Sequence, residues 1–187
     1  IVCNWGPWGQ VGMARKGSKA YSQSLKGGEE TKITGSGSKL SIVGNVGPLK
    51  NPIALDKSFA SGIFMASKAT LKILDGATLE VSKNIAGSGA GITARVEGSR
   101  SGAAGQRTRR IMQGNKATRG KGGALDIREG AAIRIGSRVR TEFVKNTAAC
   151  GGGAISLDVR ASFVVSETDQ GSGSHGGFFL AENNTAF

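Results

Sequence analysis

Few residues of this chain are suited to acid–base or nucleophilic chemistry. Its 187 residues include 13 acids and one histidine, His175. Cleavage of a polysaccharide requires carboxyl groups paired across a groove, and the closest approaches to such a pair are Glu29–Glu30 and, near His175, Glu167 and Asp169. The last two lie with His175 in the glycine-rich segment 167–177. We predict no catalytic residue; the segment is a candidate contact loop, and a polysaccharide lyase or hydrolase using His175 is the third functional alternative.

The two cysteines, Cys3 and Cys150, are far apart in the sequence and match no metal-ligand spacing. We therefore predict no metal and no cofactor. Their types and positions leave open whether they form a disulfide or remain two thiols.

Positive charge is the strongest chemical feature of the chain. The formal net charge is +12, and residues 91–150 contain 13 lysines and arginines against four acids. Such a field favours acidic partners, and an acidic protein surface or an acidic glycan is expected. Sequence-specific nucleic-acid binding is not indicated, because no aromatic residues alternate with the cations and no helical reading motif is present. The candidate partner-binding residues are Arg100, Arg107, Arg109, Arg110, Arg119 and Lys121.

The segments that must position these residues show the period-two alternation of β-strands. Residues 31–34, 39–43, 62–65, 70–74, 78–81 and 91–96 each predict a short strand. The stretch 122–146 predicts three more, joined by turns too short for helices. No segment has a sustained helical period, and no apolar run approaches the roughly 18 residues needed to span a membrane. The chain is predicted to be all-β.

A repeated Asn-x-Ala signature gives these strands a register. The asparagines are Asn84, Asn115, Asn146 and Asn184, and glycine followed by a small-plus-aliphatic pair comes after the first three. Asparagine tolerates left-handed backbone and bonds to local backbone groups. A unit of about 31 residues that repeats in this way predicts a right-handed parallel β-helix, a solenoid with three short strands per coil and the four asparagines stacked as a structural ladder.

The same register predicts which side chains face the core. Leu125 and Ile127 align with Ile155 and Leu157, and Ile133 and Ile135 align with Phe163 and Val165, all pointing inward. The alternate residues are expected to face solvent, with Asp158 beside Arg128 on the neighbouring coil. The predicted solvent-facing set is Asp126, Arg128, Arg134, Ser156, Asp158 and Arg160.

Two motifs of the repeat resemble those of a known family. Apolar-x-x-Asn at Phe143–Asn146 and Gly-Gly-Ala-aliphatic at Gly152–Ile155 are similar to repeats of the chlamydial polymorphic membrane proteins, which are autotransporter passengers. The resemblance covers residues 78–187, most cleanly 111–187. It implies a right-handed β-helix, an adhesin-like role and a secreted or cell-surface location. The basic middle of this chain departs from the family pattern.

Two regions follow from these patterns. Residues 1–30 are predicted to be an irregular aromatic and basic arm or cap, in which Trp5 and Trp8 cover the end of the stack or contact a partner. Residues 31–187 are predicted to be the β-helix, with about four to five coils and a basic loop at 98–110. We expect the chain to be a segment of a longer one.

The preferred function is a non-enzymatic, rigid scaffold that binds partners through its basic surface. An accessory, stabilising subunit of a large complex is the second alternative, with residues 1–30 as its tether. In that alternative the complex is associated with a membrane or an organelle. The fold alone does not decide between them, because solenoids carry many functions.

Overall fold

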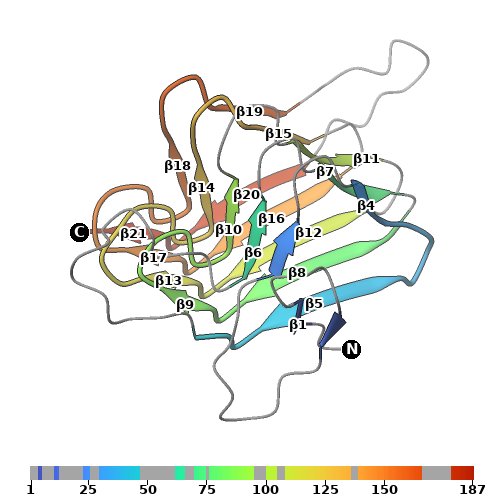
Figure 1. The fold of residues 1–187 in the computed structure, drawn as a ribbon, viewed down its shortest axis with the longest axis horizontal. Helices are drawn as coiled ribbons and strands as arrows, with labels where there is room; N and C mark the ends of the chain where they lie inside the picture. Colours follow the sequence, from blue (N-terminus) through green and yellow to red (C-terminus); the bar gives the residue numbers. More distant parts are fainter. Residues whose placement is uncertain are drawn as a thin grey trace.

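The computed structural model describes residues 4–5, 11–12, 23–25, 30–46, 62–65, 70–74, 76–94, 100–104, 108–135, 139–165 and 178–187. The regular structure within these ranges is β-strand throughout, with no helix (Figure 1). The prediction of an all-β protein is therefore confirmed.

Four parallel sheets follow a short antiparallel pair, β1 (Asn4–Trp5) and β2 (Val11–Gly12). The first parallel sheet contains β3 (Gln23–Leu25), β6 (Ile63–Met65), β10 (Ile92–Ala94), β14 (Leu125–Ile127) and β18 (Ile155–Leu157). The second contains β4 (Glu30–Ile33), β7 (Thr70–Leu74), β11 (Arg100–Ala104), β15 (Ala132–Ile135) and β19 (Ser162–Val165). The third contains β5 (Lys39–Val43), β8 (Thr78–Ser82), β12 (Arg109–Gln113), β16 (Arg140–Val144) and β20 (Phe178–Glu182). The fourth contains β9 (Ile85–Ala86), β13 (Lys116–Ala117), β17 (Thr147–Ala148) and β21 (Thr185–Ala186).

The chain visits these sheets in a fixed order, and we call one pass through them a row. The row β14–β15–β16–β17, for example, lies between the rows that begin at β10 and at β18. Equivalent strands of neighbouring rows pair in parallel, as Arg109 of β12 does with Thr78 on one side and Arg140 on the other. Parallel pairing places neighbouring rows about 4.8 Å apart. Residues that share a row position therefore form columns across the sheets.

Three predictions about the elements need correction. The Asn-x-Ala turn forms a fourth, two-residue strand in the four rows that begin at β6, β10, β14 and β18, so these rows have four strands rather than three. The parallel sheets begin at Gln23, inside the segment predicted as an arm, because β3 pairs with β6. The predicted loop at 98–110 contains β11 and the start of β12. Strand β11 pairs with both β7 and β15, and such pairing satisfies the backbone of a segment without apolar alternation.

The core is a continuous stack of aliphatic side chains from successive rows. Leu125, Ile127, Ile133 and Ile135 are fully buried, as predicted. Their predicted counterparts in the last row are more exposed: Leu157 is 50% exposed and Val165 is 40% exposed, because β18 and β19 are the edge strands of their sheets in the described part of the chain. The partly buried Phe163 nevertheless packs with Phe143 and Phe179 (ring centroids 6.2 and 5.9 Å away).

Small residues allow the rows to approach closely at the Gly-Gly-Ala motif. A Cβ atom on Gly123 would lie 2.2 Å from the carbonyl oxygen of Gly153 and 2.6 Å from that of Thr147. Neither oxygen belongs to a flexible side chain, so any larger residue would separate the rows. The motif therefore marks a contact between the turn and the next row.

Candidate functional site

The asparagines form a continuous ladder of hydrogen bonds through the turns that follow the third sheet. In each step the Oδ1 atom accepts from the backbone N–H and the Nδ2 group of the asparagine one row earlier, at 2.9–3.2 Å. The Nδ2 group also donates to a backbone carbonyl of the earlier row, as from Asn115 to Val81 at 2.9 Å. The ladder contains the predicted Asn84, Asn115, Asn146 and Asn184, and also Asn45. The sequence signature missed Asn45, because Val46-Gly47 follows it instead of x-Ala.

The residue before each ladder asparagine adopts a left-handed backbone conformation. Their φ angles are 71° at Gly44, 55° at Lys83, 63° at Gly114, 55° at Lys145 and 53° at Asn183. A non-glycine residue pays about 1–2 kcal/mol for this conformation, so the ladder and the row pairing must hold the turn in place. Lys83 and Lys145 are both exposed there.

Five exposed cations lie on these turns. No acidic residue occurs in the turn segments 44–46, 83–91, 114–124, 145–154 and 183–187. Among the described residues, none of the five cations forms an ion pair. We call this set the basic corner: Lys83, Lys116, Arg119, Lys121 and Lys145.

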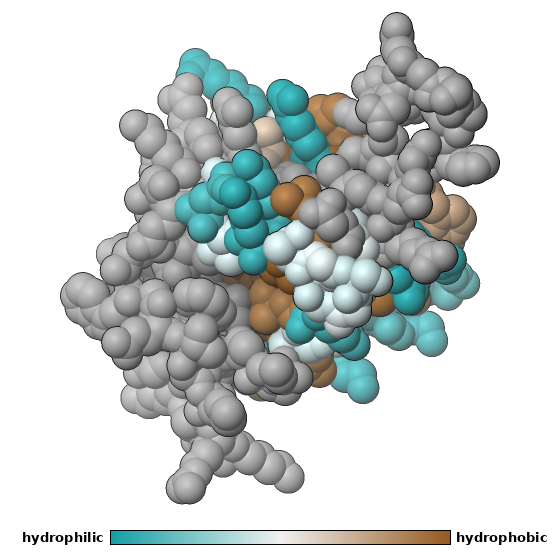
Figure 2. Space-filling model, turned by 90° about the vertical axis from the view of Figure 1, so that its right-hand side faces the viewer, coloured by the Kyte–Doolittle hydropathy of each residue, from teal (hydrophilic) through white to brown (hydrophobic). Residues whose placement is uncertain are grey.

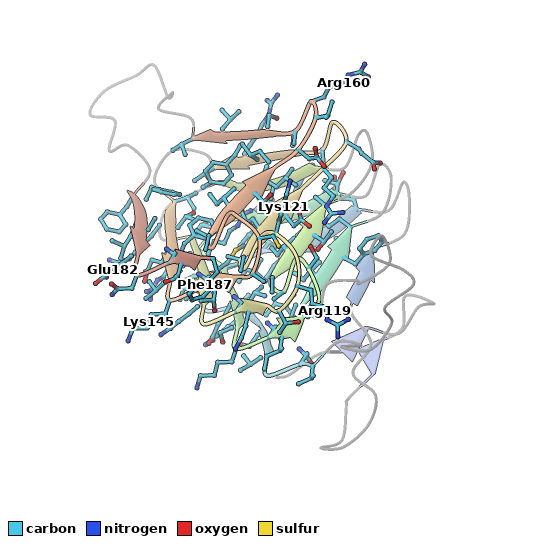
Figure 3. All side chains as sticks on the ribbon, turned by 90° about the vertical axis from the view of Figure 1, so that its left-hand side faces the viewer. Arg119, Lys121, Lys145, Arg160, Glu182 and Phe187 are labelled. Carbon is cyan, nitrogen blue, oxygen red and sulfur yellow. The ribbon has the colours of Figure 1, made fainter. Side chains whose placement is uncertain are left out.

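Figure 3 faces the side of the molecule that carries these turns: Lys145 and the C-terminal Phe187 lie towards one edge of the view, Lys121 lies nearer the middle and Arg119 lies towards the opposite edge. One acidic residue, Glu182 at the end of β20, borders the corner at the last row. Its Oε1 atom accepts a hydrogen bond from Asn183 Nδ2 at 3.3 Å. Glu182 is therefore an exposed anionic neighbour of the corner at its C-terminal edge, on the adjoining sheet.

The outer face of the third sheet is also rich in cations, but acids compensate them. Lys39 Nζ lies 2.6 Å from Glu80, and Arg109 Nη2 lies 3.1 Å from Glu142, which also pairs with Arg140. Burial raises the pKa of Glu142, and the hydrogen bonds from the two arginines outweigh that effect and lower it. The hydrogen bond from Lys39 likewise lowers the pKa of Glu80. Both acids are therefore charged at neutral pH.

The second sheet shows the same compensation on a smaller scale. Glu30 binds Lys32 on its own strand and Lys72 on the neighbouring strand β7, each at 2.7 Å. These contacts lower the pKa of Glu30, and the hydrogen bond from Lys32 has the largest effect. Glu30 was half of the Glu29–Glu30 pair considered for catalysis; Glu29 lies outside the described residues.

Figure 2 shows a face of the molecule on which hydrophilic and hydrophobic residues lie interspersed.

The structure brings only some of the predicted partner-binding residues together. Arg119 and Lys121 belong to the basic corner, Arg109 is exposed but paired, and Arg100 lies in β11. Arg107 and Trp8 lie outside the described residues, and Trp5 lies in β1. Arg110 is wrong as a surface contact, since it is fully buried in β12 between Leu79 and Thr141 of the neighbouring strands. That burial lowers its pKa to about 10.

Sequence reasoning missed three residues of the corner, Lys83, Lys116 and Lys145, as binding candidates. The signal was present, because each is adjacent to a ladder asparagine: Lys-Asn at 83–84 and 145–146, and Asn-Lys at 115–116. The prediction instead followed the run of arginines from Arg100 to Arg110, which was predicted to be a loop and which contains β11 and the start of β12.

A second polar cluster lies on the first sheet and corrects the predicted exposure of two residues. Asp126 and Ser156 were expected to face solvent, but they are 1% and 8% exposed. The turn at Ser88 and Gly89 covers the outer face there: Ser88 Oγ donates to Asp126 Oδ2 (3.1 Å), and Arg128 pairs with the same oxygen (2.6 Å). The cluster holds the turn against β14.

Asp158, predicted beside Arg128, accepts a hydrogen bond from the Val159 N–H at 2.8 Å. Cys150 is an exposed free thiol, and Cys3 lies outside the described residues, as do Glu167, Asp169 and His175. Within the described ranges, no three His, Cys, Asp or Glu side chains are grouped as a metal site would require. No helix long and apolar enough to cross a membrane occurs in the same part of the chain.

Comparison with known proteins gives no relative: no family model, no curated protein and no solved structure matches this chain.

Proposed function

We propose that the rows wind as a right-handed parallel β-helix, and that this solenoid is a rigid, non-enzymatic module binding acidic partners through the basic corner. The parallel register of four sheets and the asparagine ladder support the solenoid. The observation that carries the binding role is the set of five exposed cations on turns without an acid. An adhesin-like role at a cell surface follows from the motif resemblance.

The contrast with the third sheet gives this proposal its physical basis. A cation that already has a carboxylate partner gains little from a second anion, because the new contact competes with the existing one. A cation without a partner attracts an incoming anion with its full charge, within the screening length of about 8–10 Å in physiological salt. The corner is therefore the surface at which an acidic macromolecule gains the most binding free energy.

The test removes charge from each surface in turn. The first variant carries Lys83→Gln, Lys116→Gln and Lys145→Gln; the matched control carries Lys32→Gln, Lys39→Gln and Lys72→Gln, which removes three paired lysines. Exposed charge contacts contribute on the order of 0.5 kcal/mol each, so we expect the first variant to bind dextran sulfate about tenfold more weakly. The control should bind within about twofold of the wild type. Equal losses of affinity in the two variants would mean that binding depends only on net charge, and would contradict a specific binding role for the basic corner.

A further inference from the structure

We infer that the ligand of the basic corner is a linear acidic polysaccharide lying along the stack, across the rows; this rests on the proposed function of the corner. The cations come from three successive rows. Lys83 and Lys145 occupy the same turn position two rows apart, roughly 10 Å, and Lys116 belongs to the row between them. The charges therefore extend along the stacking direction and suit an extended chain with anionic groups at intervals.

Small residues occupy several of the turn positions next to these cations. Ala86, Ala117 and Ala148 form one buried column, and Gly114 leaves the position between Lys83 and Lys145 without a side chain. Thr147 of the next column is half-buried. An extended chain with repeated anionic groups can therefore pass Gly114 on its way from Lys83 to Lys145 without meeting a side chain at that position.

The composition of the corner favours a glycan over the other polyanions. Single-stranded nucleic acid is held by aromatic side chains on which the bases stack, and in the described turn segments the aromatic residue is Phe187, at the far end. Protein interfaces have aromatic and arginine-rich centres and are depleted of lysine, whereas four of the five corner cations are lysines. Carboxylate or sulfate groups on a sugar chain require only spaced cations.

The experiment measures how affinity depends on ligand length. Oligogalacturonates of increasing length are titrated into the wild-type protein, with neutral galactan oligomers as the control for sugar binding without charge. We expect affinity to rise until the oligomer reaches from Lys83 to Lys145 and then to level off. Lys83→Gln should weaken the binding of long oligomers by about threefold, the effect of one exposed charge contact. The affinity of this variant should also level off at a shorter oligomer length. Dimers should be unaffected by Lys83→Gln.

Two further ligands separate this inference from the proposed function. Poly-L-glutamate or a single-stranded oligonucleotide could bind through the corner lysines more tightly than the oligogalacturonates do. The inference that the ligand is a glycan would then be wrong, and the proposed binding of acidic partners would stand. Affinity that does not change with oligomer length would overturn the alignment along the rows. If the triple corner variant of Lys83, Lys116 and Lys145 binds every polyanion as the wild type does, the glycan and the proposed function both fail.

Discussion

The basic corner and the outer face of the third sheet carry similar columns of cations and differ in what lies beside them. On the sheet, Lys39, Arg109 and Arg140 stand two columns from Glu80 and Glu142 on the same face, and the acids pair with these cations. On the corner, the turn columns contain lysine, arginine and small or uncharged residues, with no acid. In a stack of parallel rows, whether a cation can bind an external anion therefore depends on the residues in the neighbouring columns. It does not depend on how many cations lie close together in the sequence.

The arginine-rich stretch illustrates this difference. Arg109, Arg110 and Arg119 lie within eleven consecutive positions, yet one is paired with an acid, one is buried and one is free on the corner. Alternation along β12 separates the first two, since neighbouring side chains of a strand point to opposite faces. The row spacing then decides which acid lies beside the exposed one.

The ladder supports the corner, and breaking it should have the largest effect. Asn115→Ala removes partners from Asn84 N–H and Nδ2, from the Val81 carbonyl and from Asn146 Oδ1, all of them buried. Leaving such groups unsatisfied costs about 1–3 kcal/mol each, and we expect a loss of about 3–5 kcal/mol in the free energy of unfolding, measured by urea denaturation. Dextran sulfate binding should weaken as well, although no charge changes.

The matched control is Asn184→Ala at the end of the ladder. Asn184 makes the same bonds to Asn146 and to the Phe143 carbonyl, but it is only half-buried and water can replace it, so the expected loss is about 1 kcal/mol. Similar losses at Asn115 and Asn184 would show that the ladder does not act through buried hydrogen bonds.

Much of the scaffold could be predicted from the sequence, because its signals are local. Alternating residues predicted β14, β15 and β16, and the Asn-x-Ala spacing predicted the ladder. Strand β11 was missed because pairing on both sides holds it without apolar alternation. Asn45 was missed because its turn lacks the alanine that follows the other ladder asparagines.

The site was harder to predict, because its character depends on contacts between rows. Whether Arg109 is available depends on Glu142, 33 residues later. The burial of Asp126 depends on the turn at Ser88, 38 residues earlier. The residue pattern along one strand does not show which residues of other rows lie beside it. The pairing of charges between rows and the covering of a sheet face can therefore be recognised only in the folded structure.

An acid placed in the corner should make it resemble the third sheet. Gly114 lies between Lys83 and Lys145 in the turn column, and a Cβ atom there would meet only Lys83 Cγ, at 3.8 Å. Gly114→Glu and Gly114→Lys impose the same left-handed strain, which both lysines already accept. We expect Glu to weaken dextran sulfate binding about threefold and Lys to strengthen it about threefold, as one exposed charge contact would. Equal affinities in titrations at low salt would contradict a binding role for this column.

An effect of similar, small size should come from titrating the acids that compensate the sheet. The Arg140 and Arg109 contacts lower the pKa of Glu142 from 4.5 against the effect of burial, so its ion pairs contribute stability above that pH. The contribution, within about 1 kcal/mol, is lost as pH falls through the lowered pKa. Sulfate groups stay ionised there, and we expect wild-type binding of dextran sulfate to rise about threefold as both arginines become available. Glu142→Gln should show the stronger binding already at neutral pH, with a flatter pH profile. If that variant binds as the wild type does at neutral pH, the arginines of the third sheet were never masked, and the difference between the two surfaces must come from their shape.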